Sequence, residues 1–231
     1  MIKNIIFDLG GVLLDVDMKR CFQQFKNLGV NPELFTSNNN SPNAQESTIC
    51  EGMSASGIIA LYQTGDISTT DFINTIQKAC FPNTTYDQVL NAWNSCLFSI
   101  PQKKLEVVKQ LHEKYNTYML SNTNEAHWEY IYNNSFPTHK PDLSLYFNKV
   151  FLSQEMHLAK PNPQIYKEML KAIDATPSEC LFIDDASANT IAAENLGIKT
   201  LTVEASKINE QGNIIPPAHD WCNIIHEELQ P

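Results

Sequence analysis

The sequence predicts an α/β fold: a doubly wound, Rossmann-like and mostly parallel sheet, with a small helical cap inserted after the first strand. Three observations favour this fold. A short apolar segment at the amino terminus stops at an acid that is followed within two residues by a glycine pair. A long helical stretch comes next, and strand-like segments resume only after it. From there on, apolar strands alternate with helical patterns, which is typical of a parallel sheet with helices on both faces.

The first strand is expected over Ile2 to Phe7, a nearly continuous apolar run. Asp8-Leu-Gly-Gly follows at once, and its glycines permit a sharp turn, for which a positive φ at Gly10 is one allowed conformation. Helical periodicity then marks the segments Met18 to Asn27, Ser54 to Tyr62 and Thr70 to Ala79, with a polar, low-complexity loop at Ser37 to Pro42. We therefore expect a discontinuous core domain formed by residues 1–16 and 90–231, and a helical cap domain formed by residues 17–89.

The second half of the chain supplies the rest of the sheet. Apolar, strand-like segments occur at Thr117 to Leu120, Lys149 to Leu152, Leu181 to Ile183 and Lys199 to Val203. Helical patterns separate them at Leu105 to Lys114, Pro163 to Ile173 and Ala188 to Leu196.

Composition limits the classes of partner. The 231 residues carry a net charge of -10, and Arg20 is the only arginine, so the chain has no basic surface for a nucleic acid backbone. The apolar part of the amino terminus is too short for a signal peptide, and no apolar run is long enough to span a bilayer. We therefore expect a cytoplasmic protein with neither nucleic acid nor membrane as a partner. Its six cysteines include no Cys-x-x-Cys pair and are expected to be reduced.

Polar side chains stand at four strand ends of the predicted sheet, where ligands bind in folds of this kind. Each alone has an ordinary explanation as a turn residue, a helix cap or a solvated charge. Together, in this order on this topology, they indicate one site. The set consists of Asp8, Ser121, Asn122, Lys160, Asp184 and Asp185.

This set suits phosphoryl transfer. A carboxylate that attacks a phosphate dianion meets repulsion of about 4 kcal/mol per charge pair at about 4 Å in a pocket near the surface. A Mg²⁺ ion held by Asp8, Asp184 and Asp185 would supply the missing positive charge. Lys160 would add a second positive group and orient the nucleophile. Hydrogen bonds from Ser121 and Asn122, and from the backbone N–H groups of the Leu9-Gly10 turn, would stabilise the transferring group.

Four segments resemble, in order, the four motifs of the haloacid dehalogenase superfamily. They are Ile-Ile-Phe-Asp8-Leu-Gly-Gly-Val-Leu, Tyr-Met-Leu-Ser121-Asn-Thr-Asn, Ala-Lys160-Pro-Asn-Pro-Gln-Ile-Tyr and Phe-Ile-Asp184-Asp-Ala-Ser-Ala-Asn. The resemblance covers essentially the whole chain, and the insertion after the first motif looks like the small helical cap of that family. It implies a phosphatase that acts on a small phosphorylated metabolite, with a sugar phosphate as the expected substrate. The cap would close over the site and set substrate specificity.

The same resemblance implies roles for the site residues. Asp8 matches the nucleophile, which forms an aspartyl-phosphate, and Lys160 matches the catalytic lysine. Asp184 and Asp185 match the acids that hold Mg²⁺ together with Asp8, and Gly10 matches a position that gives the metal a backbone carbonyl. Ser121 and Asn122 match the phosphate-binding second motif.

One position departs from the pattern. Most phosphatases of this superfamily carry a second aspartate two residues after the nucleophile, and this chain has Gly10 there. The Asp-Leu-Gly-x-Val form resembles a branch that includes alpha-D-glucose-1-phosphate phosphatases. Asp15 and Asp17 lie a few residues further on and are expected to cap helices rather than to replace the missing acid.

Two alternatives remain open at this point. A 2-haloacid dehalogenase shares the fold and the nucleophile, needs no metal and holds its substrate with a cap arginine, for which only Arg20 is available. A binding or regulatory protein could keep the fold without the activity, because fold alone does not establish function. A phosphomutase is disfavoured, since it depends on the aspartate that Gly10 replaces. The six histidines show no metal-binding spacing and are expected at the surface or satisfied in the core.

Overall fold

The computed structural model describes residues 1–30, 57–217 and 220–229. Its main sheet has five parallel strands in the order β3-β2-β1-β4-β5. Their bounds are β1 (Asn4–Phe7), β2 (Asn116–Ser121), β3 (Lys149–Leu152), β4 (Cys180–Asp184) and β5 (Lys199–Thr202). These strands confirm the predicted doubly wound sheet. The low-complexity loop predicted at Ser37 to Pro42 lies outside the described residues.

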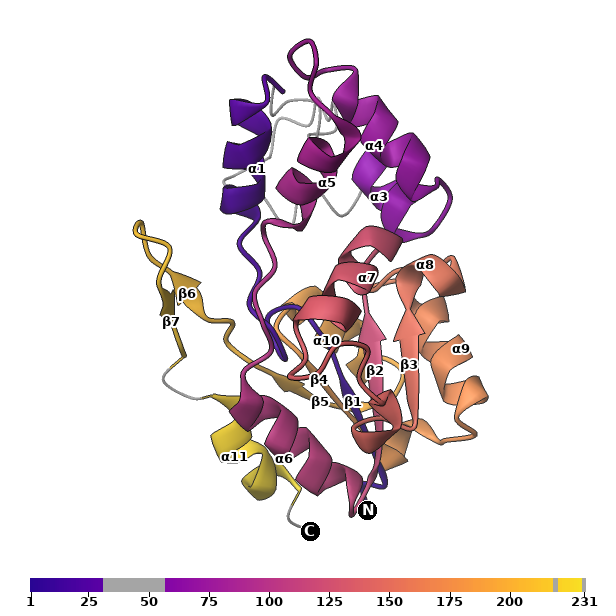
Figure 1. Cartoon of the computed structure of the whole chain (residues 1–231). Helices are drawn as coiled ribbons and strands as arrows, with labels where there is room; N and C mark the ends of the chain where they lie inside the picture. Colours follow the sequence, from indigo (N-terminus) through magenta and orange to yellow (C-terminus); the bar gives the residue numbers. More distant parts are fainter. Residues whose placement is uncertain (31–56, 218–219, 230–231) are drawn as a thin grey trace, which may run out of the picture.

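Helices cover both faces of this sheet (Figure 1). Successive residues of a strand point to opposite faces, and β1 shows the consequence. Ile5 and Phe7 belong to a buried cluster with α6 (Gln102–His112), α7 (Glu125–Asn134) and α11 (Trp221–Glu228), whereas Ile6 packs in a second cluster with α9 (Pro163–Ala172) and α10 (Ser187–Glu194). Shorter elements complete the core: η2 (Leu143–Leu145), α8 (Ser153–Met156), η3 (Pro177–Glu179), and a hairpin of β6 (Lys207–Ile208) and β7 (Ile214–Ile215).

The cap contains α1 (Met18–Asn27), α3 (Ile58–Gln63), α4 (Thr69–Gln77) and α5 (Tyr86–Asn94), and it lies beyond the carboxyl ends of the strands (Figure 1). Its helices pack around buried aromatic rings. Trp93 of α5 contacts Phe25 of α1 and Phe72 of α4, with ring centroids 6.3 and 4.8 Å apart. Burial of such large rings is the main stabilising contribution in a small helical unit.

Two antiparallel segments join the cap to the core. Val16 pairs with Leu97, the N–H of Asp17 donates to the Cys96 carbonyl at 2.8 Å, and the N–H of Phe98 donates to the Asp15 carbonyl at 3.2 Å. The predicted boundary between residues 89 and 90 falls inside α5, which packs against α1 and α4. We propose that the cap ends instead at this pair of crossing segments, near residue 96.

The bulk expectations can be compared with the described residues. Cys21, Cys80, Cys96, Cys180 and Cys222 are all free thiols there, and Cys50 lies outside them. None of the described helices has the length and apolar character that crossing a bilayer requires.

Candidate active site

Three carboxylates converge at the carboxyl edge of the sheet. Asp8 follows β1, Asp184 ends the neighbouring strand β4, and Asp185 comes next. One oxygen of each lies within 4.8 Å of the others. The strand order reverses between β1 and β4, which is the position where doubly wound sheets bind ligands. This arrangement of hard oxygen ligands fits a Mg²⁺ ion.

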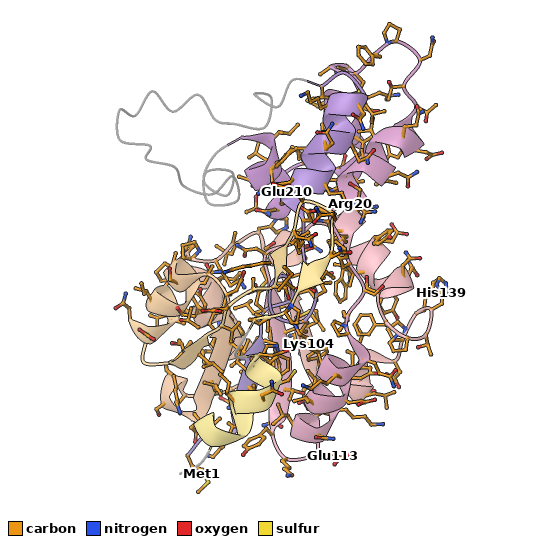
Figure 2. The ribbon with its side chains drawn as sticks, turned by 90° about the vertical axis from the view of Figure 1, so that its left-hand side faces the viewer. Met1, Arg20, Lys104, Glu113, His139 and Glu210 are labelled. Carbon is orange, nitrogen blue, oxygen red and sulfur yellow. The ribbon has the colours of Figure 1, made fainter. Side chains whose placement is uncertain are left out.

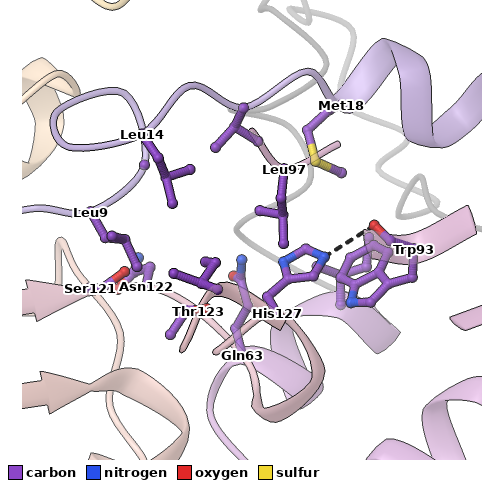
Figure 3. A pocket seen from close by; sticks show the side chains of 14 residues that line it. Leu9, Leu14, Met18, Gln63, Trp93, Leu97, Ser121, Asn122, Thr123 and His127 are labelled. Atoms are coloured by element: carbon purple, nitrogen blue, oxygen red, sulfur yellow. Dashed lines mark hydrogen bonds between the residues drawn. The ribbon is translucent and has the colours of Figure 1, made fainter. Parts of the chain in front are cut away.

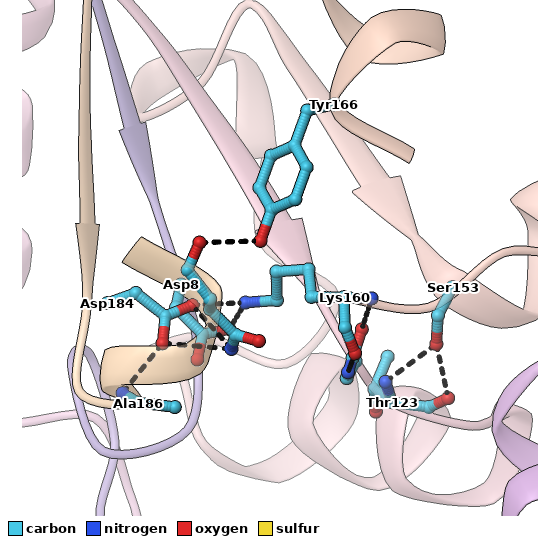
Figure 4. A network of polar contacts seen from close by, with 9 residues as sticks. Asp8, Thr123, Ser153, Lys160, Tyr166, Asp184 and Ala186 are labelled. Carbon is cyan, nitrogen blue, oxygen red and sulfur yellow. Dashed lines mark hydrogen bonds and ion pairs between the residues drawn. The ribbon is translucent and has the colours of Figure 1, made fainter. Parts of the chain in front are cut away.

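Lys160 joins two of these carboxylates (Figure 4). Its Nζ lies 2.8 Å from Oδ1 of Asp8 and 2.6 Å from Oδ2 of Asp184, and its side chain is completely buried. A buried ammonium is tolerated only where its charge and its donors are matched in this way. The single lysine does not balance three carboxylates, so the cluster keeps an excess of negative charge that a divalent cation would neutralise.

The electrostatics of the cluster follow from burial and charge crowding. Burial, with added repulsion from Asp184 and Asp185, raises the pKa of Asp8 to about 7 against the lowering effect of Lys160. Burial and the neighbouring Asp184 likewise raise the pKa of Asp185 to about 6. For Lys160, burial opposes the charged form, but attraction to Asp8 and Asp184 prevails and its pKa is raised. Lys160 therefore stays positively charged, and Asp8 and Asp185 gain and lose protons near neutral pH.

The two acids of the Asp184-Asp185 pair have different surroundings. Asp184 is fully buried, and its oxygens accept from Lys160, from the N–H of Ala186 at 2.8 Å and from the Asn189 side chain at 3.0 and 3.1 Å. Asp185 is partly exposed, and no side chain of the described residues donates a hydrogen bond to its carboxylate. Asp8 thus keeps one oxygen that Lys160 does not contact, Asp185 keeps a carboxylate that faces the other acids, and Asp184 mainly anchors Lys160.

The turn after β1 brings backbone groups to the same point. Gly11, not Gly10, has the positive φ, at 74°, so the conformation allowed for Gly10 in the sequence analysis is wrong. A Cβ on Gly11 would lie 2.2 Å from Oδ2 of Asp185, which means that only glycine lets the turn approach this acid. The N–H groups of Gly11, Leu13 and Leu14 bond within the turn. Within the described chain, those of Leu9 and Gly10 have no carbonyl partner and are free to bind an anion.

The two residues of the second motif, Ser121 and Asn122, have different contacts. Ser121 ends β2 and is buried, and both Ser121 and Asn122 line the cavity described below. The amide of Asn122, however, is engaged with the backbone of Lys160: its Nδ2 donates to the Lys160 carbonyl, and its Oδ1 accepts from the Lys160 N–H, each at 2.8 Å. The Asn122 side chain therefore positions Lys160, whereas the Ser121 hydroxyl has no hydrogen-bond partner among the described residues.

A cavity of about 220 Å³ opens beside this turn, between the cap and the core (Figure 3). Leu9, Gly10, Ser121 and Asn122 line its inner end. The cap contributes side chains from three helices, among them Met18, Ile59, Gln63 and Trp93, and the core helix α7 contributes His127 and Ile131. The cavity thus connects the predicted phosphate-binding residues with a wall that is largely apolar.

The arrangement agrees with one family. The family model of haloacid dehalogenase-like hydrolases matches residues 2–197, a range that contains every site residue described above. The chain belongs to this family. For a haloacid dehalogenase-like hydrolase, the doubly wound core and the cap over the strand ends are the expected architecture, and the sequence-based assignment to the superfamily is confirmed.

Three relatives of this haloacid dehalogenase-like hydrolase are informative. The chain is 30% identical over 204 residues to the D-ribitol-5-phosphate phosphatase of Bacteroides thetaiotaomicron, covering 88% of this chain and 93% of the relative. It is similar to a family enzyme from the same organism crystallised with magnesium and inorganic phosphate, with a TM-score of 0.77 and 36% identity over 91% of this chain and 98% of that one. It is also similar to a hydrolase of Porphyromonas gingivalis, with a TM-score of 0.80 and 28% identity over 100% of this chain and 99% of that one.

Asp15 and Asp17, the two acids that follow the first motif, have different surroundings. Asp17 caps α1 by accepting from the N–H groups of Lys19 and Arg20, as predicted. Asp15 does not cap a helix: it is buried in the crossing segments, and its Oδ1 has no partner among the described residues. The prediction that Asp15 caps a helix is therefore wrong. Neither acid lines the cavity.

Two contributors to the site were not among the predicted residues. The Asn189 side chain donates to Asp184, and His127 lines the cavity with an exposed fraction of only 8%. Asn189 could have been suspected, because it lies five residues after Asp184 in the first turns of the following helix. No spacing in the sequence distinguishes His127 from an ordinary core histidine.

Proposed function

We propose that this haloacid dehalogenase-like hydrolase is a Mg²⁺-dependent phosphatase for a small phosphorylated metabolite, a sugar or polyol phosphate, and that Asp8 is the nucleophile. The observation that carries the proposal is the contact between Lys160 Nζ and Asp8 Oδ1 at 2.8 Å beside the cavity. This contact fixes one carboxylate oxygen of Asp8 and leaves the other for attack on phosphorus.

The metal ligands in this proposal are the carboxylates of Asp8 and Asp185 and the backbone carbonyl of Gly10, with Asp184 next to them. The close set of acids and its excess negative charge support this assignment. When bound, Mg²⁺ supplies positive charge that reduces the repulsion between a carboxylate and a phosphate dianion.

The chain's own groups account for the remaining steps. The free oxygen of Asp8 forms a bond to phosphorus while the ester P–O bond breaks, and the departing alcohol oxygen takes up a proton. The hydroxyl of Ser121 and the N–H groups of Leu9 and Gly10 donate to the phosphoryl oxygens. Lys160 holds Asp8 in place throughout. Water then cleaves the aspartyl-phosphate, releases phosphate and restores the carboxylate.

The relatives support this proposal. One is named a D-ribitol-5-phosphate phosphatase, and a similar structure was obtained with magnesium and inorganic phosphate. A net charge of -10 agrees with a small-molecule partner rather than a nucleic acid.

The dehalogenase alternative has less support. Its substrate would need a cation in the cap, and Arg20 is the only arginine. Figure 2 labels Arg20 at the foot of the cap, where its guanidinium carbon lies 5.7 Å from the centroid of the Phe98 ring. It does not line the cavity. A purely regulatory role is also disfavoured, because nucleophile, lysine and metal-binding acids are assembled in contact.

Turnover of an aryl phosphate tests the proposal. We expect hydrolysis with Mg²⁺, loss of activity in EDTA, and an inactive but folded Asp8→Asn variant. Rapid acid quenching with labelled substrate is expected to leave phosphate on the wild-type protein and none on the variant. Full activity in chelator, or release of halide from a 2-haloacid, would overturn the metal-dependent phosphatase.

A further inference from the structure

The polar part of the cavity wall is confined to a few side chains. Beyond the inner end with Ser121 and Asn122, most of the wall is aliphatic or aromatic, with Leu14, Met18 and Leu97 among its members. Apart from Thr123, which follows Asn122 in the chain, Gln63 from the cap and His127 from the core are the polar side chains that line this outer part (Figure 3). In a largely apolar pocket, a few such groups determine which ligand fits.

The tautomer of His127 follows from its contacts. Its ring stacks on Trp93 with the centroids 4.5 Å apart and the planes inclined by 15°. Its Nε2 lies 3.2 Å from the Trp93 carbonyl oxygen, and a carbonyl can only accept, so Nε2 carries a proton. Cys96 Sγ also lies on this side of the ring, 3.7 Å from Nε2. In the neutral ring the other nitrogen, Nδ1, is therefore an acceptor.

Nδ1 is directed away from Trp93 and into the cavity (Figure 3). The residue is 8% exposed, and no donor from the described chain reaches this nitrogen. A buried acceptor without a partner costs free energy, unless water or a ligand supplies a donor. The stacked ring and the Nε2 bond hold the acceptor in a fixed direction, which is what a recognition site requires.

Gln63 faces the same space from the end of α3 (Figure 3). Its backbone carbonyl accepts from Ser153 Oγ at 2.6 Å, and the same oxygen accepts from the Thr123 N–H at 2.9 Å. The cap residue is thus fastened to the core beside the active site. Its side-chain amide has no hydrogen-bond partner within the described chain, so both its donor and its acceptor are open to a ligand.

We propose that Gln63 and His127 form a subsite that binds a hydroxyl group of the leaving alcohol, so that the substrate is the phosphate ester of a small polyhydroxy compound. The proposal rests on the phosphatase function proposed above and specifies its substrate class. The hydroxyl donates to Nδ1 of His127 and exchanges hydrogen bonds with the Gln63 amide, while the carbon chain packs on Leu14, Met18 and Leu97.

The cavity has room for such a substrate. Its volume of about 220 Å³ is several times the roughly 30 Å³ of one water molecule, so the short carbon chain of a triose or a pentitol fits between the cap and the core.

Paired substrates of similar length test the subsite. Glycerol 3-phosphate and a pentitol 5-phosphate are compared with propyl and pentyl phosphate, which lack the hydroxyls. The wild type is expected to have the higher kcat/KM for the hydroxylated member of each pair. His127→Gln keeps an N–H for the Trp93 carbonyl and removes Nδ1, and Gln63→Leu removes the amide. Each is expected to lower kcat/KM by about tenfold for the hydroxylated esters and to leave the alkyl esters nearly unchanged.

Controls separate this inference from the function on which it rests. Met18→Leu alters the same wall without touching a hydrogen bond, and it is expected to affect both members of a pair alike. Equal losses for both members in the Gln63 and His127 variants, or a wild-type preference for alkyl esters, would overturn the subsite. Binding of the same four esters to Asp8→Asn, measured by calorimetry, gives a readout without turnover. If the wild type hydrolyses no phosphate ester, the proposed function fails, and the ratio of binding affinities still decides the subsite.

Discussion

The side chain of Asn122 holds the backbone of Lys160 through both of its polar groups, each at 2.8 Å. The contact ties the end of β2 to the segment before α9. Because the Lys160 ammonium reaches Asp8 and Asp184 from this segment, the Asn122 amide sets the position of the charge beside Asp8, the proposed nucleophile.

Removing this amide is expected to impair the chemical step. Displacement of a catalytic group by about 1 Å can cost about 100-fold in rate. We expect Asn122→Ala to lower kcat for an aryl phosphate by about that factor, with a much smaller change in KM. Asn134→Ala serves as the control, since that exposed amide bonds only to the Tyr130 carbonyl of its own helix. An Asn122→Ala protein with normal kcat would show that the lysine is positioned by other contacts.

Lys160→Met is expected to inactivate the protein and to destabilise it. The substitution leaves Asp8 and Asp184 buried without their cation, and breaking a buried pair in this way costs about 3 to 5 kcal/mol. The loss should be smaller near about pH 5 than near about pH 8, because protonated carboxyls carry no charge to repel. Urea denaturation at the two pH values measures it. Lys3→Met, which breaks the exposed pair with Glu179, is expected to have little effect on stability, because solvent screens that pair.

Mg²⁺ affinity is expected to rise with pH across the neutral range. The pKa values of Asp8 and Asp185 are raised to about 7 and about 6, so each acid holds a proton below its value and the metal must displace it. As pH rises and these acids ionise, the metal-free protein becomes less stable, because the negative charges repel one another. Bound metal reduces this repulsion. The increase in Tm caused by Mg²⁺ should therefore be larger at about pH 8 than at about pH 5.5. Asp185→Asn should remove most of the increase in Tm that Mg²⁺ causes. If the increase is unchanged in this variant, Asp184 and not Asp185 is the metal ligand.

The two neighbouring glycines are expected to respond differently to alanine. At Gly11, φ is 74° and the added Cβ would lie 2.2 Å from Asp185 Oδ2, so Gly11→Ala should abolish Mg²⁺-dependent stabilisation and activity. At Gly10, φ is not positive and the Cβ would meet Val16 Cγ2 at 3.3 Å, a contact that a side chain can relieve. Gly10→Ala should therefore stay folded and active. Melting curves with and without Mg²⁺, together with kcat, compare the two variants.

The absence of an acidic side chain at Gly10 is expected to make the rate of hydrolysis depend on the leaving group. A positioned general acid contributes about 100- to 10,000-fold, and Gly10 has no side chain to act as one. Sugar 1-phosphates and aryl phosphates, whose leaving oxygens need less protonation, should then be hydrolysed with higher kcat/KM than the corresponding 6-phosphates. Because a Cβ at Gly10 points toward Val16 in the cavity wall, Gly10→Asp should place a carboxyl beside the substrate and narrow this gap. A folded Gly10→Asp protein with an unchanged ratio would show that another group donates the proton. Asp17 is not that group in this structure, since it caps α1.

Much of the fold was predictable because its signals are local. β3 and α1 have the predicted bounds, and β1, β2, β4 and β5 differ by only one or two residues. Strands that are buried on both faces of a sheet are apolar along their whole length, and the helices that cover the sheet show a helical period of apolar residues, so both can be recognised in the sequence. The boundary of the cap was less predictable. α5 continues past residue 89 because Trp93 near its end packs on rings from α1 and α4, and such long-range packing leaves no local mark.

The sequence by itself determined which groups meet at the edge of the sheet. Asp8, Ser121 and Asp184 each follow or end a strand, and parallel strands bring their carboxyl ends to one edge whatever the packing around them. Lys160 comes after α8, which follows β3, so the path of that loop also contributes to its position.

Only the tertiary structure decided how these groups are used. It assigned the Asn122 amide to Lys160, separated Asp184 from Asp185 by their surroundings, and turned Nδ1 of His127 into the cavity. Hydrogen bonds and burial depend on atoms from distant segments. A residue type at a given position therefore states what chemistry is available, and the packing of the other elements determines which partner that chemistry serves.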